Sequence, residues 1–108
     1  MTFLDEATWR GKAFSSGWTA VSGGEAPVTE PATGAELGRV GLASPADIAA
    51  AARAAAAAQP AWAALPHTER SAILRRAGDI WKTHAGEIEG WSIREGGKIG
   101  RASCRERV

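Results

Sequence analysis

The sequence predicts an α/β fold in which a small antiparallel β-meander comes first and two or three helices follow. Residues 14–43 alternate short β-prone runs with turns rich in Gly and Pro. Residues 44–59 have an interior that is almost all alanine and carry helix start and stop signals, and from Pro66 onward apolar residues recur at helical spacing. With 108 residues, 44% of them hydrophobic, the chain is one small domain at most.

Composition excludes several classes of protein. No window approaches 18 apolar residues without a charge, so we expect no transmembrane span. The first residues, MTFLDEATWRGK, lack the apolar centre of a signal peptide, and we expect no secretion signal. The single cysteine cannot form an internal disulfide, which favours a reducing, cytoplasmic setting. A formal charge of +1 argues against general affinity for nucleic acid or anionic membranes.

The first two segments are a loose N-terminal arm, residues 1–13, and the meander, residues 14–43. In the arm, Trp9 is expected to dock on the body of a larger protein. The meander has three expected strands, at 14–21, 26–30 and 37–42. Glycines at 23 and 24 supply a turn with positive φ, Pro27 suits an edge strand, and Pro31 to Gly34 form a second turn. Strands of this length are not stable alone.

The alanine-rich helix has a marked beginning and end. Ser44 is the expected N-cap, Pro45 stands at the first helical position, and Asp47 completes an acidic variant of the capping box. Pro60 cannot continue the hydrogen-bond ladder, so the helix should end near Gln59. A helix surface of alanines buries little apolar area against neighbouring elements, but it allows those elements to approach closely.

The rest of the helical part, which as a whole spans residues 44–98, begins at Pro66. An apolar stripe follows at helical spacing: Ile73, Ala77, Ile80, Trp81, His84 and Ile88. Charged residues fall mostly off that stripe: Arg70, Arg75, Arg76, Asp79 and Lys82. We expect this helix to fold back beside the alanine helix as a hairpin. A break near Ala85–Gly86 separates a third helix, 87–94, which Gly96 and Gly97 end.

Candidate chemistry is sparse, and we predict no catalytic, cofactor-binding or metal-binding residue. The glycines at 34, 38 and 41 have the wrong spacing for a phosphate loop and are better explained by a turn and a strand. His67 and His84 have no ligand partners at metal-binding spacing. Glu87 and Glu89 are two residues apart on a helix, so they point to different faces and form no catalytic pair.

Residues 99–108, IGRASCRERV, form a tail of different character. Arginines beside Cys104 would lower the pKa of a thiol, but no base lies near it in sequence. Arg101, Arg105 and Arg107 could touch phosphate, although no other basic face supports this. The segment matches, codon by codon, the translation of a common short-read sequencing adapter. We therefore expect it to be an assembly artefact, and its removal would take the net charge from +1 to −1, since three Arg and one Glu are lost.

A family resemblance emerges from residues 28–40, VTEPATGAELGRV, which resemble the opening "v-x-x-PATGe-x-l-g-x-v" segment of the aldehyde dehydrogenase superfamily. The later features keep the order of that family: Ser44 to Asp47, the alanine-rich helix, Trp62, Pro66, Glu69-Arg70, Ile73 to Arg75, and Glu95 to Lys98. Leu4, Trp9 to Lys12, Phe14 and Gly17-Trp18 are similar to its benzaldehyde dehydrogenase-like branch. The resemblance covers most of residues 3–98.

The resemblance implies an NAD- or NADP-dependent oxidoreductase of roughly three to four typical domains. In that family a cysteine thiolate attacks the aldehyde, the nicotinamide accepts a hydride, and a glutamate-activated water hydrolyses the thioester. An asparagine and a backbone N–H hold the oxyanion. The resemblance places all of these groups, and the nucleotide-binding loops, beyond this chain. Cys104 is not the family nucleophile because it lacks glycine-rich surroundings. The expected whole is a cytoplasmic homo-oligomer acting on an aldehyde, and the chain itself is expected to be inactive and to bind no cofactor.

Two other functions remain open at this point. One is a free-standing helical interaction module without catalysis, which uses the alanine helix as its docking surface and requires the chain to fold alone. The other is a peptide that binds nucleic acid through residues 99–108.

Overall fold

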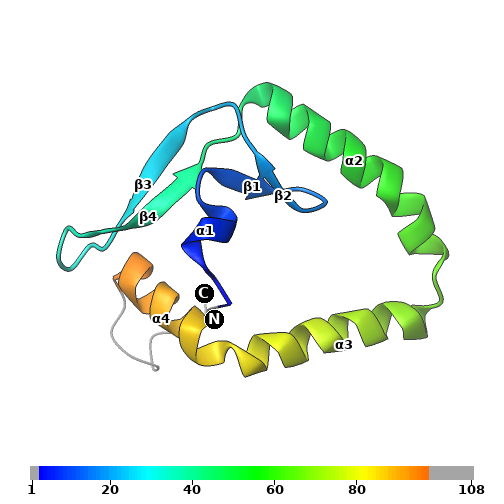
Figure 1. The fold of residues 1–108 in the computed structure, drawn as a ribbon. Helices are drawn as coiled ribbons and strands as arrows, with labels where there is room; N and C mark the ends of the chain where they lie inside the picture. The colour runs from blue at the N-terminus through cyan, green and yellow to red at the C-terminus, as the bar shows by residue number, and fades with distance from the viewer. Residues whose placement is uncertain (1–2, 98–108) are drawn as a thin grey trace.

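The computed structural model describes residues 3–97, which form two β-hairpins and four helices (Figure 1). In chain order the elements are α1 (Glu6–Trp9), β1 (Lys12–Phe14), β2 (Trp18–Ala20), β3 (Glu25–Thr29), β4 (Glu36–Gly41), α2 (Pro45–Ala64), α3 (His67–Thr83) and α4 (Ala85–Gly96). The α/β class, with short antiparallel strands ahead of helices, is confirmed.

The strands form two separate hairpins in place of the predicted three-strand meander. The expected strand over residues 14–21 is wrong, because the chain reverses within it: Ser16 and Gly17 both have positive φ, of 55° and 136°. The Ser15 N–H donates to the Gly17 carbonyl at 2.8 Å, so Lys12–Phe14 pairs antiparallel with Trp18–Ala20. The supposed loose arm therefore supplies α1 and the start of a strand.

The second hairpin follows the sequence closely. β3 and β4 pair antiparallel, and Pro27 lies opposite Arg39 in a sheet of two strands, where each strand is an edge. Gly34 closes the predicted turn with φ of 76°, and its N–H donates to the Glu30 carbonyl at 2.8 Å. Gly24 takes the expected positive φ, of 90°.

Helix α2 begins as predicted but ends later. Ser44 Oγ accepts the Asp47 N–H at 3.2 Å and Asp47 Oδ2 accepts the Ser44 N–H at 2.8 Å, which completes the capping box. The expected end at Gln59 is wrong, since the helix runs through Pro60 to Ala64. It stops at Leu65, which precedes Pro66 and takes the extended conformation (φ −63°, ψ 140°) that a following proline favours.

The predicted hairpin of α2 and α3 is also wrong. In Figure 1 α2 and α3 diverge from the corner at Leu65–Pro66. Helix α3 then runs below the strands, so that α4, which follows it, lies near the strands again. The extended corner turns the chain without laying the helices side by side, and alanine offers little area to hold them together. The predicted break before the third helix is confirmed at His84, and Gly97, with φ of 64°, caps α4.

The packed part of the molecule is small. Among residues 3–97 no hydrophobic side chain is fully buried, and Gly38 is the one buried residue. No helix within the described residues has the length and hydropathy needed to span a membrane.

Candidate functional site

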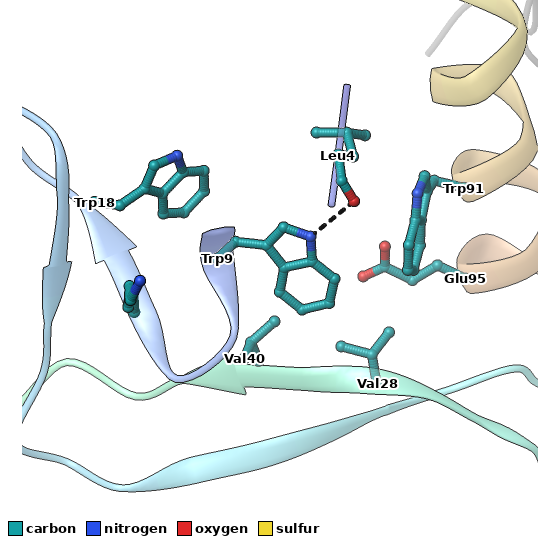
Figure 2. Close-up of a pocket in the computed structure, with 8 residues that line it drawn as sticks. Leu4, Trp9, Trp18, Val28, Val40, Trp91 and Glu95 are labelled. Atoms are coloured by element: carbon teal, nitrogen blue, oxygen red, sulfur yellow. Dashed lines mark hydrogen bonds between the residues drawn. The ribbon is translucent and has the colours of Figure 1, made fainter. Parts of the chain in front are cut away.

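The centre of the fold is a contact between two tryptophans from opposite ends of the chain. Trp9 of α1 and Trp91 of α4 pack edge to face, with ring centroids 5.7 Å apart and planes at 84°. The Trp9 indole N–H donates to the Leu4 carbonyl at 3.0 Å, which fixes the ring (Figure 2). Trp9, which we expected to dock on a larger body, thus packs within its own chain.

Gly38 of β4 makes this contact possible. A Cβ at Gly38 would lie 2.5 Å from Cη2 of Trp9, closer than carbon atoms approach. Gly41 is similar, since its Cβ would lie 2.5 Å from Cγ2 of Val21. These two strand glycines and the turn glycine, Gly34, therefore serve packing and chain reversal, as the sequence indicated, and together they form no phosphate-binding loop.

An open cavity of about 260 Å³ lies against the tryptophan pair. Its lining is Leu4, Trp9, Lys12, Trp18, Val28, Val40, Trp91 and Glu95. Figure 2 shows the Glu95 side chain close to the rings of Trp9 and Trp91 in this view. The lining offers mostly apolar surface with two opposite charges, Lys12 and Glu95, so it is suited to receiving an apolar side chain.

Glu87 joins the N-terminal segment to α4. Its carboxylate accepts the N–H groups of Phe3 and Leu4 at 2.9 and 2.8 Å, and Phe3 stacks on His84 with centroids 4.1 Å apart. Sequence reasoning considered Glu87 only as half of a catalytic pair with Glu89, which it rejected, and missed this role. A carboxylate in the first turn of a helix was the available signal. His84 is half-buried and His67 exposed, and no group of residues that could hold a metal ion occurs within residues 3–97.

A polar joint connects the β1–β2 hairpin to α2. Asp47 Oδ2 accepts the Ser22 N–H at 2.8 Å, the Ser22 hydroxyl at 2.9 Å and the Ser44 N–H at 2.8 Å. These hydrogen bonds, with the Ser22 N–H first, lower the pKa of Asp47 to about 2. The capping box was visible in the sequence, but the contribution of Ser22, 25 residues away, was not.

An ion pair connects α4 to the β3–β4 turn. Arg94 Nε lies 3.0 Å from Glu30 Oε1, and Glu30 also accepts a hydrogen bond from the Thr33 hydroxyl. The Thr33 bond and then Arg94 hold the pKa of Glu30 below its ordinary value. Because 57% of the Arg94 side chain is exposed, solvent screens the pair and weakens its contribution to stability.

The remaining sequence candidates lie outside the described residues. They are Cys104 and the arginines at 101, 105 and 107. The groups that the structure does bring together, which are the tryptophan pair, Glu87, the Asp47 joint and the Glu30–Arg94 pair, all hold elements to one another.

Comparisons with known proteins agree with this picture of a structural segment. Vanillin dehydrogenase from Amycolatopsis is 58% identical over 99 residues, which are 92% of this chain and 20% of that protein. Benzaldehyde dehydrogenase [NAD(+)] from Pseudomonas putida is 43% identical over 95 residues, 88% of this chain and 20% of that protein. The chain thus spans about a fifth of the length of these relatives. No solved structure matches it significantly.

The family model described as "Aldehyde dehydrogenase family" matches residues 18–107. The match therefore extends into residues 99–108, and the adapter origin of that tail stays a prediction. The order of motifs along the sequence, the strand-then-helix architecture and this match agree, and the chain belongs to the aldehyde dehydrogenase family.

Proposed function

We propose that this chain is the N-terminal segment of an NAD- or NADP-dependent dehydrogenase that oxidises an aromatic aldehyde to its carboxylic acid. The observation that carries the proposal is the 58% identity with a vanillin dehydrogenase over nearly the whole chain. A second relative is named for benzaldehyde and for NAD, which supports an aromatic substrate and that cofactor. The longer enzyme would act in the cytoplasm as a homo-oligomer.

The described residues do not fit a dinucleotide. Pyrophosphate binding needs backbone N–H groups at a glycine-rich helix N-terminus, and the glycines at 34, 38 and 41 serve a turn and close packing instead. The tryptophan-lined cavity offers one cation and no such loop. In our proposal the cofactor site therefore lies in other parts of the enzyme.

The reaction centre, in the same proposal, also lies elsewhere. The cysteine thioester chemistry implied by the family resemblance needs a thiolate, a glutamate that activates water, and an asparagine that holds the oxyanion. The chain has no asparagine, and its one cysteine lies in the tail. The contribution of residues 3–97 is to hold strands and helices in place through the tryptophan pair, Glu87 and Asp47.

The test is a comparison of two polypeptides. The 108-residue chain, incubated with vanillin and NAD or NADP, should give no increase in absorbance from the reduced nicotinamide. The protein obtained by reading the source locus beyond codon 98 should oxidise vanillin and benzaldehyde with higher kcat/KM than betaine aldehyde. Turnover by the 108-residue chain, or a clear preference of the longer protein for betaine aldehyde, would contradict the proposal.

One observation favours a second candidate, the helical interaction module without catalysis. Large apolar side chains of α3 are exposed, as they would be on a docking surface, although the sequence had assigned that surface to the alanine-rich helix α2. The module must fold by itself, so a cooperative thermal transition of the isolated chain would support it. A broad, non-cooperative loss of ellipticity supports the enzyme segment.

A further inference from the structure

The cavity beside the tryptophan pair holds two opposite charges that do not meet. Lys12 of β1 and Glu95 of α4 both line it, yet no ion pair within residues 3–97 joins them to each other or to another residue. Lys12 is half-buried, and its ammonium group has no carboxylate partner among the described residues. A cavity that keeps a cation and an anion apart is suited to a ligand that reaches both.

Indole rings make up much of the rest of the lining. Three of the five tryptophans of the chain take part: Trp9, Trp18 and Trp91. In Figure 2 the Trp9 ring lies between the other two in this view, and its N–H already donates to the Leu4 carbonyl. The Trp9 ring therefore offers the cavity its carbon faces and edges, on which another aromatic ring packs in offset or edge-to-face geometry.

The size of the cavity fits one aromatic ring with substituents. Its volume is about 260 Å³. An apolar cavity of about 150 Å³ in a protein is enough to hold benzene. The space here is therefore sufficient for a benzene ring that carries a polar group at each end.

From these observations we propose that the cavity binds a small aromatic carboxylate whose ring carries a hydroxyl group at the other end. The carboxylate pairs with the Lys12 ammonium, the ring packs against the indoles, and the hydroxyl donates to the Glu95 carboxylate. The proposed reaction releases an aromatic carboxylate, so this site would bind its class of product. That link rests on the proposed function, whereas the ligand class follows from the lining alone.

Two other occupants suit the cavity less well. Indole faces and a carboxylate attract a quaternary ammonium ion, but the ammonium group of Lys12 repels it. An apolar side chain from another part of a longer enzyme would fill the space and leave both Lys12 and Glu95 unpaired. An aromatic hydroxy acid fills the space and pairs both charges.

The experiment follows the tryptophans by fluorine NMR during a titration with 4-hydroxybenzoate. The proteins, which are the 108-residue chain and the longer protein read from the source locus, carry 5-fluorotryptophan, and the signals are assigned by replacing one tryptophan at a time with phenylalanine. The signals of the three lining tryptophans should shift along one saturation curve. Trp62 of α2 and Trp81 of α3 do not line the cavity, so their signals should stay in place.

Variants of the two charged residues test the proposed contacts. Lys12→Met should weaken binding of 4-hydroxybenzoate about tenfold or more, because it removes the charged partner of the carboxylate. The matched control is Lys82→Met on α3, whose side chain is 84% exposed, and it should leave the Kd unchanged. Glu95→Gln should weaken 4-hydroxybenzoate several-fold without weakening benzoate, which lacks the hydroxyl group.

Several results would overturn the proposal. They are equal shifts of lining and non-lining tryptophans, equal Kd values for the two lysine variants, and a stronger response to tetramethylammonium than to 4-hydroxybenzoate. Absence of the shifts in the longer protein would also overturn it, because another part of the enzyme would then fill the cavity. A longer protein with the expected shifts that oxidises no aromatic aldehyde would contradict the proposed function and leave this site supported.

Discussion

At the scale of single residues, the molecule depends on a few groups that satisfy several partners at once. Asp47 receives three hydrogen bonds on one oxygen, and Glu87 accepts two backbone N–H groups from the N-terminal segment. Gly38 has no side chain, and this leaves room for the Trp9 ring. Each of these roles leads to a different measurable consequence.

Asp47 should make α2 sensitive to acid. Its pKa is about 2 in the folded chain and 3.8 in the unfolded chain, so the carboxylate stabilises the fold fully above about pH 4. This stabilisation is lost as the pH falls through 2. An NMR titration of the Asp47 side chain should give the lowered pKa, and ellipticity at 222 nm should fall between pH 4 and 2. Asp47→Asn should remove this dependence, and an ordinary pKa would contradict the hydrogen-bonded joint.

Gly38→Ala should separate the tryptophan pair. The added methyl would lie 2.5 Å from Trp9, so the ring must leave its contact with Trp91, which costs about 1–3 kcal/mol. Near-ultraviolet circular dichroism, which reports on coupled indoles, should lose intensity. The control is Gly78→Ala, which faces open space within α3 and should stabilise that helix by about 1 kcal/mol. An unchanged spectrum for Gly38→Ala would show that Trp9 does not pack there.

At the scale of elements, local signals fixed where helices begin better than where they end. The capping box set the start of α2 at the predicted residue. The predicted end was wrong because Pro60, which lies inside the helix, was taken as its stop. The helix continues through Pro60 and ends at Ala64, just before Leu65 and Pro66. A proline removes one hydrogen bond from a helix, and a long run of alanines with high helix propensity can outweigh that loss.

The two prolines should therefore respond differently to substitution. Pro60→Ala should stabilise α2 by about 1–3 kcal/mol and leave the corner unchanged, because it restores a hydrogen bond inside the helix. Pro66→Ala should relax the restriction on Leu65 and let α2 and α3 join into a longer helix. Ellipticity checks the first effect and small-angle scattering the second. A more extended particle for Pro60→Ala than for Pro66→Ala would contradict this assignment of the corner.

At the scale of the whole molecule, the two ends of the described chain meet and the middle stands apart. Phe3 and Leu4 bind Glu87, and Glu30 pairs with Arg94, so α4 is attached both to the N-terminal segment and to the β3–β4 turn. In contrast, α2 and α3 extend away with exposed Ile48, Leu74 and Trp81. We therefore expect the contacts that hold α4 to break independently of the unfolding of α2 and α3.

Glu87→Gln should release the N-terminal segment. A neutral amide has one acceptor oxygen for the two N–H groups of Phe3 and Leu4, so we expect a loss of about 1–2 kcal/mol at this contact. Limited proteolysis should cut before α1 several-fold faster than in the parent chain. The control Asp79→Asn, on the exposed side of α3, should be cut at the parent rate. Equal rates for all three proteins would mean that Glu87 does not hold the segment.

The sequence by itself determined the class of the fold, the β3–β4 turn at Gly34, the capping box at Ser44 and Asp47, and the family resemblance that the comparisons bear out. These depend on neighbours within a few residues or on the order of motifs. Only the tertiary structure decided that residues 12–20 form a hairpin, that α2 and α3 diverge, and that Trp9, Gly38 and Trp91 meet. The hairpin depends on a positive φ at Ser16, a conformation that non-glycine residues rarely adopt, so the local sequence did not indicate it. Contacts between distant segments, such as that of Phe3 with Glu87, 84 residues away, take their energy from packing and geometry that no local pattern encodes.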